Sequence, residues 1–404
     1  MAGEFESPRP RRRTRILGLV GVLVLAALVG AGLFALVSSD RAVGAGGGDT
    51  AKDLAPLVEL YESLNEQAVD APDSEALIRG AIDGMLEEVD DPYARYFPAG
   101  DFDEFSASLD GTFSGVGLLL EETPQGPVIV SVLEGTPAEK AGIEAGERIV
   151  SVDGENVRDE PLENIVAKVK GDPGTSVVLG LDGGDEGARE LRVTRAEFEV
   201  STLTNEMLDG DVGYIDLQQF IDGASEQVRE ATTTLLDEGA SGIVLDLRNN
   251  PGGLLNEAVG VASVFIEDGE IVSVEERGGR SESFDAVGDA FEDVPLVVLV
   301  DEASASASEI VAGAVQDAER GRVVGQPTFG KGTVQTIAQL SDGSGAKFTT
   351  ARYYTPSGDS IEGVGVVPEV EVEAADAEDI DGLEDDPQVQ TAIEELEAQV
   401  GAAP

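Results

Sequence analysis

The chain has 404 residues, and its 80 acidic against 26 basic side chains give a formal net charge of −54. Such a polyanion repels nucleic acid, so we expect no nucleic-acid partner. Cysteine and histidine are both absent, which excludes disulfides, thiol nucleophiles, Cys/His zinc sites and an imidazole base. Acid–base chemistry must therefore use carboxylates, tyrosine, lysine or water, and we expect no metal or other cofactor.

The N-terminal region pairs a basic segment (1–15) with an uncharged apolar stretch (16–37). An apolar stretch of about 20 residues can cross a bilayer as a helix, and arginines before it favour a cytoplasmic N-terminus. We predict one transmembrane helix at 16–37, with the remaining chain on the outer face of the cytoplasmic membrane. The alternative is a cleaved signal peptide and a secreted protein, although signal peptides have a shorter apolar region of about 7–15 residues.

The next two segments are predicted to be a Gly-rich tether (38–53) and an N-terminal helical segment (54–100). Within the helical segment, 54–69 and 74–89 carry helical patterns, and apolar residues in the second recur at a spacing of three and four. The sequence "DDPY" (90–93) ends the second helix, because proline disfavours helical geometry in the residue before it.

From residue 101 the pattern changes to short β-like runs separated by glycine and proline, with strands predicted at 115–122, 126–134, 146–154 and 175–181. Short helices are predicted at 136–142 and 161–171, and this β-rich unit closes at 198. From 199 to 372 strands alternate with helices, which predicts α/β layers with parallel strand pairing. The tail (373–404) is acidic, and its last helical stretch is expected to attach only loosely.

The stretch "DEASASASEI" (301–310) contains three alternating serines directly before a helical pattern. Ser306 and Glu309 have the spacing of a capping box, in which the serine hydroxyl caps the helix. Ser306 could instead be a nucleophile, because free amides at a helix N-terminus can hold a developing oxyanion. One hydroxyl cannot serve both roles fully.

A serine nucleophile in a chain without histidine needs another base, and a neutral lysine is the plausible one. A lysine pKa near 10.4 must fall by about three units, roughly 4 kcal/mol, through burial. Lys331 in "PTFGKGTVQT" (327–336) is the best candidate, since Phe329 and the flanking glycines could exclude water; the alternative is an ordinary turn. The tight turn in "DLRNNPGGLL" (246–255) could supply oxyanion amides or be a plain strand-to-helix turn.

Several long motifs in order resemble the carboxyl-terminal processing peptidases, which are tail-specific serine proteases of family S41 with a Ser–Lys dyad. The resemblance rests on segments 77–97, 111–120, 135–157, 245–255, 304–317, 323–335 and 349–370. It implies an α/β protease core of crotonase/ClpP-like βα layers, the helical segment at 54–100 and an inserted PDZ domain at 101–198. Tyr93 and Asp359 stand where relatives often carry other residues.

The same resemblance assigns roles to individual residues. It implies that Ser306 is the nucleophile, Lys331 the general base, and Gln335 the residue that orients the lysine. Asp317 matches an aspartate that supports the site in some members, and the oxyanion donors would be the amides of Gly252 and Ala307.

A PDZ domain captures a free C-terminal carboxylate with the amides of the loop before its second strand, and the peptide then adds as a strand. The resemblance places this loop at five consecutive residues, namely Ser114, Gly115, Val116, Gly117 and Leu118. The alternative is a plain core strand that begins with glycine.

These features predict a membrane-anchored, extracytoplasmic serine endopeptidase that selects proteins or peptides by their free C-termini. The alternatives are a catalytically silent PDZ scaffold that binds C-terminal tails, and a crotonase-like enzyme acting on acyl thioesters. The sequence leaves the oligomeric state open.

Overall fold

The computed structural model describes residues 33–35, 49–70, 73–123, 126–133, 135–158, 160–183, 187–375 and 382–402. The membrane helix predicted at 16–37 lies outside these residues except for Leu33–Ala35 (β1). Those three residues form a strand that pairs in parallel with β18 (Thr333–Gln339), so the structure contradicts the predicted helix at these positions. An edge strand offers unpaired backbone groups for such an addition. In the described part of the chain, no helix has the length and apolar character needed to cross a membrane.

A six-stranded sheet forms the centre of the α/β unit, and all its pairings except β11–β12 are parallel. In spatial order its strands are β11 (Leu203–Leu208), β12 (Val212–Leu217), β13 (Gly242–Asp246), β16 (Leu296–Val300), β17 (Arg322–Gly325) and β20 (Val370–Glu371). Parallel strands are usually buried on both faces, which explains why these runs are almost continuously apolar. The predicted parallel α/β layers are confirmed.

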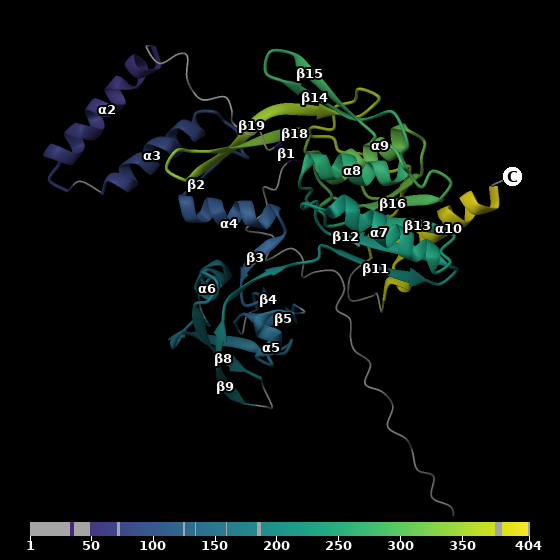
Figure 1. Ribbon diagram of the computed structural model, residues 1–404, viewed down its shortest axis with the longest axis horizontal. Coiled ribbons are helices and arrows are strands. Elements are labelled where there is room, and N and C mark those ends of the chain that lie inside the picture. The colour runs from purple at the N-terminus through teal and green to yellow at the C-terminus, as the bar shows by residue number, and fades with distance from the viewer. Residues whose placement is uncertain are drawn as a thin grey trace, which may run out of the picture.

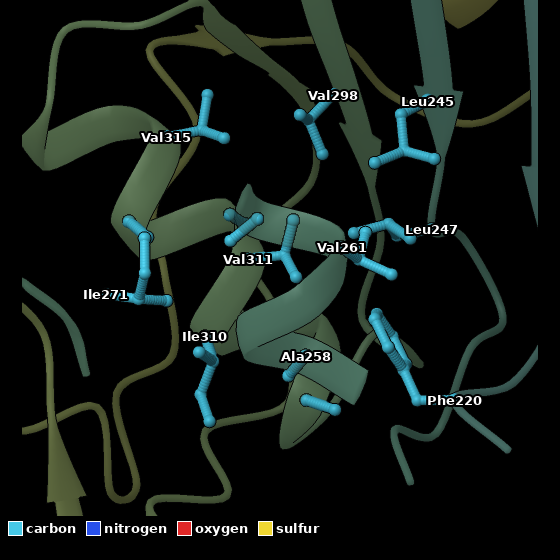
Figure 2. Close-up of a cluster of buried hydrophobic side chains, with 14 of the residues drawn as sticks. Phe220, Leu245, Leu247, Ala258, Val261, Ile271, Val298, Ile310, Val311 and Val315 are labelled. Atoms are coloured by element: carbon cyan, nitrogen blue, oxygen red, sulfur yellow. The ribbon is translucent and has the colours of Figure 1, made fainter. Parts of the chain in front are cut away.

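Helices cover both faces of this sheet (Figure 1). One face packs against α7 (Ala224–Asp237), α8 (Leu255–Phe265) and α9 (Ala307–Asp317). Figure 2 shows this core, in which Ile310 and Val311 of α9 lie among side chains from α8 and the sheet. The buried face of α9 therefore fixes the helix whose N-terminus carries Ser306.

The opposite face of the sheet is covered by α10 (Pro387–Ala402), which follows the short 3-10 helix η3 (Leu383–Asp385). The prediction of a loosely attached tail is therefore wrong for this helix: Val389, Ala392 and Leu396 are fully buried against the sheet. Gly242 leaves room for it, because a β-carbon there would lie 2.3 Å from Leu396 Cδ2. The sequence pattern missed this contact because the acidic residues lie on the outer side.

A second sheet carries the segment that follows Lys331. Its strands are β18, β19 (Gly345–Tyr354), β14 (Glu270–Glu276) and β15 (Arg280–Asp285), with β1 beside β18 and β2 (Arg95–Phe97) paired to β19. β2 belongs to the predicted N-terminal helical segment, so the far end of that segment is a strand of the second sheet rather than a helix.

The N-terminal segment contains α2 (Asp49–Gln67), α3 (Ser74–Glu87) and α4 (Ala99–Leu109). Two predicted boundaries are corrected, since α2 begins inside the expected tether and α4 runs across the expected boundary at 100/101. Phe97 and Phe105 stack with ring centroids 4.6 Å apart, beside Phe102. This aromatic cluster holds α4 against β2, and such packing is not visible in a local pattern.

The β-rich unit has its own sheet and core, which Figure 1 shows on the opposite side of α4 from the second sheet. Its strands are β4 (Leu118–Glu121), β5 (Val128–Val132), β6 (Arg148–Val152), β7 (Glu155–Asn156), β8 (Ser176–Asp182) and β9 (Ala188–Thr194), with helices α5 (Pro137–Lys140) and α6 (Leu162–Val169). A two-stranded ribbon of β3 (Thr112–Gly115) and β10 (Ala196–Glu199) joins it to the rest of the chain. The predicted strands and helices of this unit are confirmed, except that the strand expected at 115–122 is divided between β3 and β4.

Candidate functional site

The three alternating serines have different surroundings. The Ser304 hydroxyl donates to the Leu247 carbonyl at 2.8 Å, and the Ser308 hydroxyl donates to the Asn250 carbonyl at 2.9 Å. Ser306 is completely buried, yet its Oγ has no hydrogen-bond partner among the described residues. Buried hydroxyls are normally paired, so the unpaired one is the candidate for chemistry.

Ser306 also has an unusual backbone. Its φ of 58° and ψ of −110° lie outside the regions that residues with a β-carbon normally adopt. Its hydroxyl does not cap α9. Its backbone N–H instead donates to the Glu309 carboxylate at 2.7 Å, so Glu309 holds the helix start and leaves the hydroxyl unused. The capping-box arrangement of Ser306 and Glu309 predicted from the sequence is present, but within the described part of the chain the serine hydroxyl itself has no hydrogen-bond partner and remains available for chemistry.

Glu309 links Ser306 to the loop that carries Lys331. Its Oε2 accepts the Ser306 N–H at 2.7 Å and the Lys331 N–H at 2.9 Å. Its Oε1 accepts the Gly330 N–H at 2.7 Å and the Thr328 hydroxyl at 2.5 Å. Burial raises the pKa of Glu309 above its usual value, and these four hydrogen bonds oppose that rise. Four donors match an ionised carboxylate, which only accepts hydrogen bonds.

Tyr353 forms a second bridge between the same two residues. Its hydroxyl lies 3.2 Å from the Ser306 carbonyl oxygen and also donates to the Lys331 carbonyl oxygen. The side chain is fully buried, and burial raises the pKa of Tyr353 well above its usual value, so it stays neutral. With Glu309 and Tyr353 bonded to both, the backbones of Ser306 and Lys331 are held side by side.

The Lys331 side chain is only 4% exposed. Burial, followed by repulsion from Lys347, lowers the pKa of Lys331 to about 8. Its Nζ lies 4.3 Å from the centroid of the Tyr93 ring. A lysine with this pKa is partly neutral near pH 8, which is what a general base requires.

The surroundings of Lys331 agree only in part with the expectation from its neighbours. Both flanking glycines are needed for close approach: β-carbons on Gly330 and Gly332 would lie 2.9 Å and 2.8 Å from backbone nitrogens of the 362–365 loop. Phe329, however, is 60% exposed and does not cover the lysine. Tyr93, from the other end of the sequence, lies over the amine instead.

Gln335 lies on β18, fully buried. Its Nε2 donates to the hydroxyls of Thr333 at 3.0 Å and Thr349 at 3.2 Å. Its Oε1 has no hydrogen-bond partner in the part of the chain that the structure describes. An unpaired buried carbonyl oxygen is costly unless a donor uses it at some stage, and a lysine ammonium is a suitable donor.

The two predicted oxyanion donors lie against Ser306. Gly252 has a φ of 101°, and a β-carbon there would lie 2.8 Å from Ser306 Cβ and 2.9 Å from the Ala307 nitrogen. Ala307 is the first residue of α9, where an N–H has no acceptor within its own helix. The Gly252 N–H donates to Asn250 Oδ1 at 2.9 Å, so this amide is engaged in the present conformation.

Asp317 does not lie at this site. It is exposed at the last residue of the 11-residue helix α9, about 16 Å along the axis from Ser306 at a rise of about 1.5 Å per residue. Its carboxylate accepts the Ser357 N–H at 2.9 Å and anchors that loop. The predicted supporting role of Asp317 is therefore corrected to a structural one.

The predicted carboxylate-binding loop divides between two elements. Ser114 and Gly115 lie in β3, and Leu118 begins β4, an edge strand of its sheet. Val116 is buried in the core of the β-rich unit, and Gly117 (φ 84°) has no room for a β-carbon, which would lie 2.3 Å from Thr136. The outer backbone groups of β4 can therefore receive an added strand.

Sequence reasoning missed several residues of the site. Glu309 was recognised only as a helix-capping residue, and its N3 position was the available signal. Tyr93 was noted only as a departure from the family pattern. Tyr353 and Thr349 carried no local signal, because each reaches the site through contacts between distant segments. Asn250 lies in the tight turn already singled out at 246–255, but its hydrogen bond to Gly252 was not predicted.

Three segments of the chain match known protein families. Residues 211–372 match peptidase family S41, and residues 128–182 match the PDZ domain. Residues 37–100 match the N-terminal domain described for the activating protease CtpB. The inserted PDZ domain expected from the sequence is thus confirmed.

Relatives extend over most of the chain. The carboxy-terminal processing protease CtpA of Bacillus subtilis is 34% identical over 90% of this chain and 78% of its own length. The carboxy-terminal-processing protease of Bartonella bacilliformis is 37% identical over 80% and 76%. The solved photosystem II D1 C-terminal processing protease is 30% identical, covers 92% of this chain and 96% of its own, and has a TM-score of 0.51. The chain therefore belongs to peptidase family S41, as a carboxy-terminal processing serine endopeptidase with a PDZ domain.

Proposed function

We propose that peptide bonds are cleaved by a Ser306–Lys331 dyad. Neutral Lys331 Nζ takes the proton of the Ser306 hydroxyl as Oγ bonds to the scissile carbonyl carbon. The resulting ammonium then gives that proton to the leaving amine as the C–N bond breaks, which leaves an acyl-enzyme. Water attacks the ester after giving a proton to Lys331, and the proton returns to Ser306 Oγ. The observation that carries this proposal is the buried, unpaired Oγ of Ser306.

The oxyanion would be held by the amides of Ala307 and Gly252, which both lie beside the nucleophile. The Ala307 N–H lies at the helix N-terminus, where the helix dipole also favours negative charge. The Gly252 N–H must exchange its bond to Asn250 Oδ1 for one to the oxyanion. Gln335 Oε1 would accept a hydrogen bond from the Lys331 ammonium while it carries the serine proton.

The PDZ domain would select substrates by their free C-termini. Residues 114–118 include the start of β4, whose outer edge can pair with a peptide, and by the family resemblance α6 would be the opposing helix. A peptide that ends in a free carboxylate should therefore be cleaved faster than the same peptide with a C-terminal amide. Equal rates for the two peptides would contradict selection through this loop.

We further propose that the chain is anchored in the cytoplasmic membrane by the apolar stretch at 16–37, with the protease outside; in that state Leu33–Ala35 would leave its pairing with β18. The support is the sequence itself: a long uncharged stretch directly after an arginine cluster. Full-length protein should remain with membranes after alkaline carbonate extraction, and deletion of 16–37 should release it. A mature N-terminus beyond residue 37 would show that the stretch is a cleaved signal instead.

The dyad is tested with the full chain in detergent, together with Ser306→Ala and Lys331→Ala. We expect cleavage of an unfolded protein by the unmodified chain only, with all three chains showing the same circular dichroism. Retained activity in Lys331→Ala would show that another group is the base. Absence of cleavage by the unmodified chain, combined with binding of free C-terminal peptides, would favour the silent-scaffold alternative.

A further inference from the structure

The turn that carries Asp91 and Tyr93 lies against the candidate site, although it belongs to the N-terminal segment. We propose that Asp91 and Tyr93 are positioning residues for the proposed Lys331–Gln335 pair: Asp91 acts through Thr349 to orient the Gln335 amide, and Tyr93 holds the Lys331 amine. This inference rests on the proposed Ser–Lys chemistry and extends it to a segment outside the α/β core.

Asp91 lies half-buried beside Thr349, 258 positions away in the sequence. Its Oδ2 accepts the Thr349 N–H at 2.6 Å, and its Oδ1 accepts the Thr349 hydroxyl at 3.1 Å. An ionised carboxylate only accepts hydrogen bonds, so the single hydroxyl proton of Thr349 is directed at Asp91.

The direction of that proton decides the orientation of Gln335. With its proton committed to Asp91, the Thr349 hydroxyl can offer only a lone pair to the amide, and it accepts from Gln335 Nε2 at 3.2 Å. Thr333 Oγ1 also lies on the Nε2 side, at 3.0 Å. Gln335 Oε1 is therefore the unpaired atom. Without Asp91, Thr349 could donate to the amide oxygen, and a flipped amide would present Nε2, which cannot accept from an ammonium.

Tyr93 acts on the other member of the pair. Its ring centroid lies 4.3 Å from Lys331 Nζ, and ring faces attract cations. The ring therefore favours the protonated amine, the form that the lysine takes as it removes the serine proton. The charged groups acting on this amine are Lys347 on β19, which opposes the ammonium, and Glu309, Glu362 and Asp91, which favour it.

The turn is held in place from both sides. The Tyr93 N–H donates to Asp91 Oδ1 at 3.0 Å, which fixes the two residues relative to each other. Directly after it, β2 pairs with β19 in the register Arg95↔Lys347, four residues along the chain from Asp91. The pairing and the aromatic cluster around Phe97 leave the turn little freedom to move away from the site.

The orientation of Gln335 is tested by comparing Thr349→Val with Thr350→Val in the full chain. Both threonines are half-buried on β19. The Thr349 hydroxyl contacts Asp91 and Gln335, whereas the Thr350 hydroxyl contacts Thr336 Oγ1 at 2.7 Å. We expect Thr349→Val to lower kcat about tenfold at unchanged KM, the cost of losing one oriented hydrogen bond, and Thr350→Val to stay within about twofold. Equal effects of the two changes would overturn the inference.

Asp91→Asn provides an independent test, because an amide can donate to Thr349 and release its hydroxyl proton. It should lower kcat about as much as Thr349→Val, and the double variant should be no slower than either single one, since both act on one chain of hydrogen bonds. Additive losses would show that Asp91 does not act through Thr349. Thermal midpoints, measured in parallel, separate these effects from loss of folding.

Tyr93 is tested by Tyr93→Phe and Tyr93→Leu through the pH dependence of kcat. Phenylalanine keeps the ring and should leave the profile unchanged, whereas leucine should lower kcat about threefold to tenfold and move its acidic limb to lower pH. An unchanged profile for leucine would overturn the role of the ring. Activity retained by Lys331→Ala would contradict the proposed dyad itself. An inactive Lys331→Ala, together with Thr349→Val and Tyr93→Leu variants as active as the unmodified chain, would contradict only the positioning roles of Asp91 and Tyr93.

Discussion

Replacing Lys331 with methionine should abolish cleavage and at the same time stabilise the fold at neutral pH. Methionine keeps the length and apolar stem of the side chain but removes the buried amine. The pKa of Lys331 is lowered from 10.5 to about 8, mainly by burial. At about 1.36 kcal/mol per pKa unit, a fall of the pKa from 10.5 to about 8 corresponds to roughly 3 kcal/mol for keeping the charged amine inside the fold at pH 7.

The stability gained by Lys331→Met should depend on pH in one direction. Below pH 8 both folded and unfolded chains carry the lysine proton, so the full penalty applies to the unmodified protein. Between about pH 8 and 10.5 the unfolded chain binds more protons than the folded one, and the stability contributed by this group rises with pH. Lys331→Met lacks this contribution, so its advantage should shrink across that window.

The assay is urea unfolding of the full chain in detergent at pH 7 and at pH 9.5, followed by circular dichroism. Lys140→Met, at an exposed position on α5, is the matched control and should change the free energy of unfolding by less than about 0.5 kcal/mol. Equal stability of Lys331→Met and the unmodified protein at pH 7 would refute the reasoning, because it would mean that the buried amine carries no desolvation cost.

Four further predictions concern the same site and the helix beneath the sheet. For the unmodified chain, kcat/KM for a short peptide substrate should rise with pH around a midpoint near 8, as Lys331 loses its proton. Lys347→Met removes a charge that repels the Lys331 ammonium, so it should move this midpoint to higher pH. Ser306→Gly should be about 1 kcal/mol more stable than Ser306→Ala in urea, because only glycine adopts the positive φ without strain; equal midpoints would count against that strain. Gly252→Ala should lose activity, since its β-carbon would lie 2.7 Å from the Ala305 carbonyl oxygen, and normal turnover would show that the turn can move. Leu396→Ala should lower the free energy of unfolding by about 2–5 kcal/mol, and a change below 1 kcal/mol would mean that α10 is dispensable.

Much of the fold could be predicted because it follows from local patterns. The apolar strands of the central sheet and the helices between them have periodicities set by the burial of each element, and proline and glycine mark where elements end. The N-terminal boundaries and α10 were predicted less well. Leu396 and the aromatic cluster around Phe97 are buried by elements far away in sequence, and no local pattern records such a partner.

The candidate site divides in the same way. The sequence by itself determined that histidine chemistry is impossible, and that Ser306, Lys331 and Gln335 stand in motifs of a serine protease family. Only the tertiary structure decided which serine hydroxyl is unpaired, that Asp317 lies at the wrong end of its helix, and that the lysine is covered by Tyr93 instead of Phe329. The reason is physical: burial, pKa and hydrogen-bond partners depend on neighbours in space, and here those neighbours come from segments as much as 258 positions apart.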